Sequence, residues 1–283
     1  MKAETEIVDI NGWLIHVEKY CYPGVVESLI CVNGALSTTL AFRNCVKSFK
    51  HKVNVILFDL PFIGQSRTHN VITRPLPKSE EVIILNALIA RYSPDYLLSV
   101  SWGGLAALMT LATGQHSIRK AVIASFSPTI TPAMASYIKR ARMLLDEGKN
   151  EAVATLLNDE VGKYLPGLLK QVNHEHIKSL DKETYQQASF HIGQINQLRL
   201  EDYVAIFKKI EQPVLFVNGE LDEYTRPEDI RLMADYVRDC DFRTVPEAGH
   251  FLDMETRAAA QQVHRILNDY FAPAGLLPLS ETG

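Results

Sequence analysis

The sequence predicts an α/β fold, in which a mainly parallel sheet is flanked by helices and a helical insertion interrupts the alternation of strands and helices. Two observations predict it. Short apolar runs alternate with segments of helical composition through most of the chain, and these runs contain few polar residues, as is typical of parallel strands buried on both faces. From residue 129 to residue 207 the strand pattern is almost absent, and it returns afterwards.

These patterns divide the chain into two parts and a tail. Residues 1–128 and 208–271 form the predicted α/β core, and residues 129–207 form a predicted helical cap. The last segment, 272–283, is rich in proline, glycine and serine and is expected to be flexible. A chain of 283 residues, of which 47% are hydrophobic, can bury a large core. Because long insertions in compact domains are usually functional, we expect the cap to act as a lid.

The charge and the cysteine content exclude several classes of protein. The formal net charge of −4 argues against nucleic-acid binding and against attachment to an acidic membrane surface. Four cysteines without metal-like spacing suit a reducing compartment, so a cytoplasmic location is expected. The N-terminal residues lack the apolar segment of a secretion signal, and no run of about eighteen apolar residues predicts a membrane span.

The N-terminal half supplies the first elements of the predicted sheet. Asn11-Gly12 lies between two strand-like runs and is typical of a tight hairpin turn. Ser79, followed by Glu81, is a typical start of a helix. The expected strands are 5–10, 14–18, 28–32, 53–58, 95–100 and 121–124, and the expected helices are 38–50, 79–92 and 105–112.

The second half begins with helices alone and then resumes the alternation. Within the insertion the apolar residues recur with helical spacing, and near the C-terminus each strand is again followed by a helix. The expected helices of the insertion are 133–147, 150–158, 165–172 and 182–195. The expected later elements are strands 213–217 and 242–245 and helices 227–237 and 255–271.

A strand-to-helix turn with a serine at its apex is the first chemical signal. The apolar run 95–100 stops at Ser101, and Gly103 and Gly104 follow before the next helix. The nucleophile elbow of α/β-hydrolases has this form, with small residues two before and two after the serine so that strand and helix can pass close together. Here Ser99 takes the place of the usual first glycine. Ser101 is the predicted nucleophile; a plain turn that contains a serine is the alternative.

Two later strand ends supply an acid and a base. Asp222 follows strand 213–217, and His250 follows strand 242–245. Because parallel strands end at one edge of a sheet, we expect these side chains to meet Ser101 there. The order Ser, Asp, His is that of α/β-hydrolase triads, in which histidine takes the serine proton and aspartate orients the imidazole. Glu223 is the alternative acid, and a turn aspartate and a loop histidine are the alternatives without catalysis.

Two backbone amides are the predicted oxyanion donors. One belongs to Trp102, the residue after the serine, and the other to Ala35, in the loop that Gly34 lets turn tightly after strand 28–32. Asp59 is a further candidate acid, but it precedes the serine in the chain. We interpret Asp59 and Gly64 as structural turn residues.

Two clusters in the insertion give weaker signals. His174 and His176 flank a glutamate, but positions two apart point to different sides of a helix and no partner cluster is evident, so no metal site is predicted. The basic residues Lys139, Arg140 and Arg142 are expected to form a solvated face, with binding of phosphate or of an acidic carrier protein as the alternative. No motif predicts a cofactor.

Beyond the elbow, several motifs resemble one family. The chain is similar to the RhlA/PhaG group of acyltransferases of the α/β-hydrolase fold, and the similarity extends over nearly the whole chain, including the insertion. The motifs that carry it are Val32-Asn33-Gly34-Ala35, Phe58-Asp59-Leu60-Pro61-Phe62, Ser101-Trp102-Gly103-Gly104, Gly162-Lys163-Tyr164-Leu165-Pro166, Phe190-His191-Ile192, Asp222-Glu223-Tyr224-Thr225 and Gly249-His250-Phe251-Leu252-Asp253.

The resemblance implies an activity. It implies an acyltransferase that joins two (R)-3-hydroxyacyl units, taken from thioesters of acyl carrier protein or coenzyme A (CoA), into a 3-(3-hydroxyalkanoyloxy)alkanoate, the lipid precursor of rhamnolipid-type surfactants. It also implies Ser101 as nucleophile, Asp222 as acid and His250 as base, in agreement with the assignment above, and a downstream glycosyltransferase as a partner. The cap is expected to wall the acyl site, and its candidate lining residues are Met134, Tyr137, Leu144, Leu165 and His191.

Other functions remain open at this point. A transacylase that moves the 3-hydroxyacyl group from acyl carrier protein to CoA would use the same triad, as would a 3-hydroxyacyl thioesterase or a carboxylester hydrolase. The loop 59–66 resembles RhlA more closely, whereas 125–128 and 249–255 resemble PhaG at least as closely. A module that only binds a ligand would be expected to have a broken triad.

Overall fold

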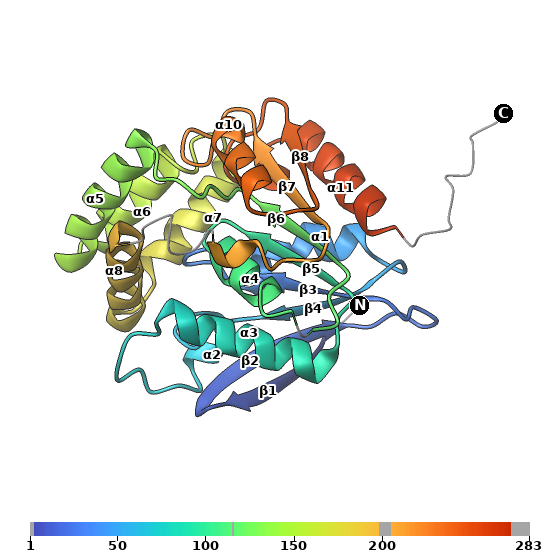
Figure 1. The fold of residues 1–283 in the computed structure, drawn as a ribbon. Helices are drawn as coiled ribbons and strands as arrows, with labels where there is room; N and C mark the ends of the chain where they lie inside the picture. The colour runs from blue at the N-terminus through green and yellow to red at the C-terminus, as the bar shows by residue number, and fades with distance from the viewer. Residues whose placement is uncertain (1–2, 115, 198–204, 273–283) are drawn as a thin grey trace.

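An eight-stranded sheet runs through the centre of the protein (Figure 1). The computed structural model describes residues 3–114, 116–197 and 205–272. The strand order is β1-β2-β4-β3-β5-β6-β7-β8; the pairs from β4 to β8 are parallel, and β1 and β2 form an antiparallel edge. The bounds are β1 Glu4–Ile10, β2 Trp13–Tyr20, β3 Ser28–Val32, β4 Asn54–Phe58, β5 Tyr96–Val100, β6 Lys120–Ala124, β7 Val214–Gly219 and β8 Cys240–Val245.

The predicted hairpin and the predicted parallel strands are confirmed. Asn11 and Gly12 both have positive φ, 53° and 86°, as a two-residue hairpin loop requires, and they join β1 to β2. The central strands β3, β4, β6 and β7 are buried almost throughout, which explains their continuous apolar runs.

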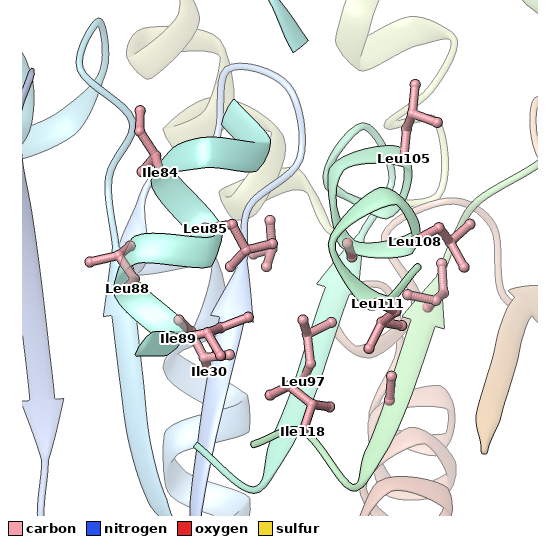
Figure 2. Close-up of a cluster of buried hydrophobic side chains, with 14 of the residues drawn as sticks. Ile30, Ile84, Leu85, Leu88, Ile89, Leu97, Leu105, Leu108, Leu111 and Ile118 are labelled. Atoms are coloured by element: carbon pink, nitrogen blue, oxygen red, sulfur yellow. The ribbon is translucent and has the colours of Figure 1, made fainter. Parts of the chain in front are cut away.

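Helices cover both faces of the sheet. On one face α3 and α4 pack side by side, and Leu85, Leu88 and Leu108 belong to one hydrophobic cluster with Ile30 and Leu97 of the strands beneath them (Figure 2). On the other face α1 and α11 lie together (Figure 1). The bounds of the core helices are η1 Thr39–Phe42, α1 Arg43–Ser48, α2 Gly64–Arg67, α3 Lys78–Tyr92, α4 Gly103–Leu111, α10 Pro227–Ile230, η2 Arg231–Asp235, η3 Leu252–Met254 and α11 Arg257–Phe271.

Two predicted helices are divided, and the short helices α2 and η3 are not predicted. The expected helix 38–50 begins as the tight turn η1 and continues as α1, and the expected helix 227–237 is α10 followed by η2. Tight 3₁₀ turns are common at helix ends, and residue patterning does not distinguish them from α-helix. The short helix α2 lies in the loop that was interpreted as a turn.

Four consecutive helices between β6 and β7 form a group of their own. They are α5 Pro132–Asp146, α6 Asn150–Asp159, α7 Gly167–Lys178 and α8 Lys182–Gln197. They pack around a hydrophobic cluster that includes Ile138, Leu145, Val153 and Tyr185. These helices fall inside the predicted cap, although α7 starts after Pro166 and runs to Lys178 rather than ending at 172. The predicted tail lies outside the described residues except for Ala272.

No helix in the described part of the chain combines the length and the apolar character that a membrane crossing requires.

Candidate active site

Ser101 occupies a sharp turn between β5 and α4. Its φ is +50°, an uncommon value for a residue other than glycine, and its amide donates to Ala124 O at 2.8 Å. The two glycines that follow permit this turn. A Cβ on Gly103 would lie 2.5 Å from Asn33 O, and one on Gly104 would lie 2.7 Å from the Phe126 ring. The strand, helix and neighbouring loop therefore approach as closely as the elbow motif predicts.

The structure brings together the three residues predicted to form a triad. Ser101 Oγ lies 3.0 Å from His250 Nε2, and His250 Nδ1 lies 2.7 Å from Asp222 Oδ2. Asp222 can only accept, so Nδ1–H donates to it and leaves Nε2 free to accept the serine proton. Asp222 also accepts hydrogen bonds from Tyr224 N at 2.9 Å and from Thr225 Oγ1 at 2.5 Å, which hold the carboxylate in place.

The electrostatics of the pair favour a charged acid and a basic histidine. Burial alone would raise the pKa of Asp222, but His250 and the hydrogen bonds from Thr225 and Tyr224 outweigh it and lower the pKa to about 2. Burial alone would lower the pKa of His250, but the neighbouring Asp222 carboxylate outweighs it, and the net shift is upward. The imidazole is thus a better proton acceptor than an isolated histidine.

Glu255 supports the histidine loop and was not predicted. Its two carboxylate oxygens accept from Gly249 N at 2.5 Å and from Phe251 N at 3.0 Å, so it holds the backbone on both sides of His250. Burial raises the pKa of Glu255, and the two amides partly offset this. The sequence pattern predicts Glu255 as the first residue of the last helix, and an acidic residue a few positions after the loop histidine is the signal that could indicate its role.

The two alternative acids lie elsewhere. Glu223 is exposed and pairs with Lys163 at 2.8 Å. Asp59 is fully buried and accepts from Thr39 N and Gln65 N, both at 2.8 Å, so it organises its own loop. Gly64 has φ +57°, and a Cβ there would lie 2.2 Å from Asp59 Oδ2. The interpretation of Asp59 and Gly64 as turn residues agrees with these contacts.

The predicted oxyanion donors border the serine. Gly34, next to Ala35, lies so close that a Cβ on it would be 3.3 Å from Ser101 Cβ. Neither Ala35 N–H nor Trp102 N–H donates a backbone hydrogen bond to any residue that the structure describes. Two amides without acceptors near the predicted nucleophile are suited to bind a developing oxyanion.

A large apolar cavity of about 970 Å³ opens onto Ser101 and His250. Aliphatic and aromatic side chains of the sheet ends and of the group α5–α8 form most of its wall. Four of the predicted lining residues border it: Met134, Tyr137, Leu165 and His191. The fifth, Leu144, does not. On that turn of α5 the neighbouring Leu145 points into the cavity, and Leu144 packs within the helical group instead.

A buried ionic network connects α3, the elbow and α8. Lys78 Nζ lies 2.5 Å from Glu81 Oε2, and the other oxygen, Glu81 Oε1, lies 2.8 Å from His191 Nε2. Lys78 also lies over the Trp102 ring, 3.8 Å from its centre, and His191 stacks on that ring. Burial alone would raise the pKa of Glu81, but the neighbouring Lys78 and His191 outweigh it and lower the pKa to about 2. Burial lowers the pKa of Lys78 to about 8.

The histidine and arginine clusters of the insertion have partners both inside and outside it. His174 lies 3.4 Å from Glu151, and His176 Nε2 donates to Leu36 O at 2.9 Å. Arg140 pairs with Glu160 at 2.5 Å.

The fold and the site together define a class of protein. A family model described as alpha/beta hydrolase fold matches residues 27–255. The chain belongs to the alpha/beta hydrolase fold family. Solved structures agree at the level of the fold. An alpha/beta hydrolase from a Medee basin deep-sea metagenome (TM-score 0.78, 15% identity) covers 96% of this chain and 99% of its own. The enol-lactonase of Burkholderia xenovorans LB400 (TM-score 0.78, 17% identity) covers 95% and 100%.

Two relatives narrow the class. The "(R)-3-hydroxydecanoyl-ACP:CoA transacylase" of Pseudomonas aeruginosa is 41% identical over 281 residues, which cover 99% of this chain and 94% of the relative. The protein of the same name from Pseudomonas putida is 38% identical over 274 residues, covering 96% and 93%. The predicted membership of the RhlA/PhaG group is confirmed.

Proposed function

We propose that this protein is a serine-dependent acyltransferase that joins two (R)-3-hydroxyacyl units into a 3-(3-hydroxyalkanoyloxy)alkanoate. The observation that carries the proposal is the hydrogen-bonded series Ser101, His250 and Asp222 at the end of an apolar cavity of about 970 Å³. Family membership and the two relatives support acyl transfer and 3-hydroxyacyl substrates, since a 3-hydroxydecanoyl group, acyl carrier protein and CoA all appear in the relatives' name.

In the first half-reaction Ser101 takes the acyl group. His250 Nε2 removes the proton from Ser101 Oγ as the oxygen attacks the thioester carbon, and Asp222 stabilises the imidazolium that forms. The carbonyl oxygen becomes negative and is bound by the amides of Ala35 and Trp102. Each such donor contributes on the order of 3–4 kcal/mol in the transition state. The C–S bond then breaks, His250 returns the proton to the thiol, and an acyl ester of Ser101 remains.

In the second half-reaction a hydroxyl group removes the acyl unit. The 3-hydroxyl of a second 3-hydroxyacyl thioester attacks the ester carbon while His250 accepts its proton, and the C–O bond to Ser101 breaks with return of that proton to the serine oxygen. Water then cleaves the thioester of the acceptor and releases the alkanoate. This ester is the acceptor that the predicted downstream glycosyltransferase would use.

The size of the cavity supports two acyl chains at once. At roughly 30 Å³ per non-hydrogen atom, the share of a water molecule in the liquid, a 3-hydroxydecanoyl group of about twelve such atoms needs ~360 Å³. Two groups need ~720 Å³ by the same measure, less than the cavity of about 970 Å³. For transfer to exceed hydrolysis, the second chain must lie against the acyl-serine while water is kept away.

We further infer that residues 129–207 act as the cap of a core formed by 1–128 and 208–271. Helices α5–α8 contribute Met134, Tyr137 and Leu165 to the cavity wall, whereas the triad residues follow strands β5, β7 and β8. The cap thus holds the apolar chains, and the core holds the reacting groups.

A second candidate function is favoured by one observation, the printed name of the relatives, in which CoA accepts the acyl group. In that case the CoA thiol, rather than a 3-hydroxyl group, attacks the acyl ester of Ser101. The first half-reaction is the same in both candidates, which differ from the attack on the acyl ester of Ser101 onward.

A product assay distinguishes them. The purified protein would be incubated with 3-hydroxydecanoyl-acyl carrier protein, with and without CoA, and the products read by mass spectrometry. The proposal expects the dimeric ester in both mixtures. Formation of 3-hydroxydecanoyl-CoA without dimer would establish the transacylase instead, and release of free 3-hydroxy acid alone would indicate a thioesterase.

The Ser101→Ala variant is the control for the site. Removal of a triad nucleophile typically lowers turnover by ~10⁴-fold to 10⁶-fold. Mass spectrometry of the intact wild-type protein should also detect the acyl adduct, which the variant cannot form. A variant that retains turnover within about tenfold of the wild type would contradict the assignment of Ser101.

A further inference from the structure

A run of basic residues stands beside the cavity on α1 and the turn after it. Arg43, Lys47, Lys50 and Lys52 are all exposed, and residues 28–58 contain no aspartate or glutamate. This is unusual in a chain with 33 acidic and 29 basic residues. We call these four residues the α1 basic edge.

Within the described structure, the charges of this edge form no ion pairs. Lys52 donates to Asn268 Oδ1 on α11 at 2.8 Å, a neutral partner. Among the described residues, no carboxylate lies within 4.0 Å of any of the four cations. The nearby acids are engaged elsewhere: Glu18 accepts from Thr39 and Tyr20, and Asp253 lies beside His264. The edge is therefore a positive surface open to a partner.

The edge adjoins an opening of the active-site cavity. Arg43 and Leu40 both line the cavity that contains Ser101, and both are exposed, Leu40 to 56%. Lys47 lies one helical turn further along α1, about 6 Å from Arg43 along the helix axis. A partner bound to the edge would thus be positioned next to an entrance that leads to the nucleophile.

We propose that the α1 basic edge is the docking surface for the acyl carrier protein that delivers the 3-hydroxyacyl thioester. This inference rests on the proposed function. Acyl carrier proteins are acidic, and they carry the acyl group on a flexible pantetheine arm. Docking on Arg43, Lys47, Lys50 and Lys52 matches that charge and allows the arm to enter beside Leu40. Charge complementarity at such a rim mainly accelerates association and makes it sensitive to salt.

The test is a charge reversal at two exposed positions that do not line the cavity, Lys47→Glu with Lys50→Glu. The values of kcat/KM would be measured for 3-hydroxydecanoyl-acyl carrier protein and for the uncharged 3-hydroxydecanoyl N-acetylcysteamine thioester. We expect a loss of about tenfold or more with the carrier protein, and a change of less than about twofold with the small thioester, because only the carrier protein contacts the edge.

The dependence of kcat/KM on ionic strength is a second test of the proposed contact. Between about 0.1 M and about 1 M salt the Debye length shrinks from ~10 Å to ~3 Å. The wild-type kcat/KM for the carrier-protein substrate should fall over this range, whereas the doubly reversed variant should be nearly insensitive to salt.

The matched control reverses two exposed charges on the cap, Lys139→Glu with Arg142→Glu on α5. This control variant should keep kcat/KM for both substrates within about twofold of the wild-type values. The proposal would be overturned if the α5 variant lost as much kcat/KM for the carrier-protein substrate as the α1 variant. It would also be overturned if the α1 variant lost kcat/KM equally for both substrates. Binding of holo-acyl carrier protein, followed by fluorescence anisotropy, tests the edge without turnover. Binding by the wild type but not by the α1 variant supports the docking surface even if the proposed reaction fails, and equal binding by both refutes it.

Discussion

The buried pair Lys78–Glu81 makes a quantitative prediction about stability. Both residues are buried, with 5% of Lys78 and 4% of Glu81 exposed, and Glu81 is the carboxylate that faces Lys78, His191 and the Trp102 indole. In Glu81→Gln the shape and one hydrogen-bond acceptor remain, but Lys78 is left as a buried cation without a counter-charge. Breaking a buried ion pair in this way typically costs 3–5 kcal/mol.

We expect Glu81→Gln to lower the free energy of unfolding by about 3 kcal/mol, near the lower end of this range, because two features limit the penalty. Lys78 keeps its contact with the Trp102 ring at 3.8 Å. Burial already lowers the pKa of Lys78 to about 8 beside Glu81. Without Glu81 this pKa falls further. The folded variant then loses the lysine proton at a lower pH than the wild type, while the unfolded chain keeps it. The stability deficit should therefore shrink as the pH rises toward 8.

Urea unfolding followed by circular dichroism at about pH 6 and about pH 8 measures this deficit. The double variant Lys78→Met with Glu81→Gln removes both charges and should recover most of the loss. Asp229→Asn, which breaks an exposed pair with Arg226, is the matched control and should leave the urea midpoint nearly unchanged. A single variant within about 0.5 kcal/mol of the wild type, or a double variant no more stable than the single one, would refute the reasoning.

Three further predictions concern the site. Because Asp222 raises the pKa of His250, the acid limb of kcat/KM should lie above pH 6.5, since the base must be neutral to accept the proton; a midpoint below that value would contradict the pairing. Asp222→Asn should lower kcat by ~10⁴-fold, whereas Glu223→Gln should stay within a few-fold of the wild type in the same assay. Gly103→Ala would place a Cβ 2.5 Å from Asn33 O, so thermal unfolding should show clear destabilisation and turnover should fall; wild-type behaviour would show that the close approach is not needed.

The features predicted correctly share a local cause. Each central strand lies within about two residues of its predicted position, because a strand covered on both faces must be a continuous apolar run between turn residues. Ser101 directly follows β5, and Asp222 and His250 lie in the loops that follow β7 and β8, so their meeting could be inferred from the parallel topology.

The features that were missed depend on contacts between distant segments. Glu81 and His191 belong to helices far apart in the chain, and neither helix alone indicates that they meet at Trp102. Glu255 looked like an ordinary helix residue, because only the folded loop shows that it accepts from the amides around His250. Leu144 and Leu145 are both apolar, and which of them reaches the cavity depends on how α5 packs.

The origin of the cavity wall has an evolutionary consequence. In our proposal the residues that react follow strands of the sheet, whereas Met134, Tyr137 and Leu165, which border the acyl chains, belong to one insertion between β6 and β7. Substitutions in that insertion can lengthen or shorten the space for the hydrocarbon without moving the serine, the histidine or the aspartate. Descendants of one ancestor can therefore diverge in the length of the lipid they handle while their chemistry stays the same.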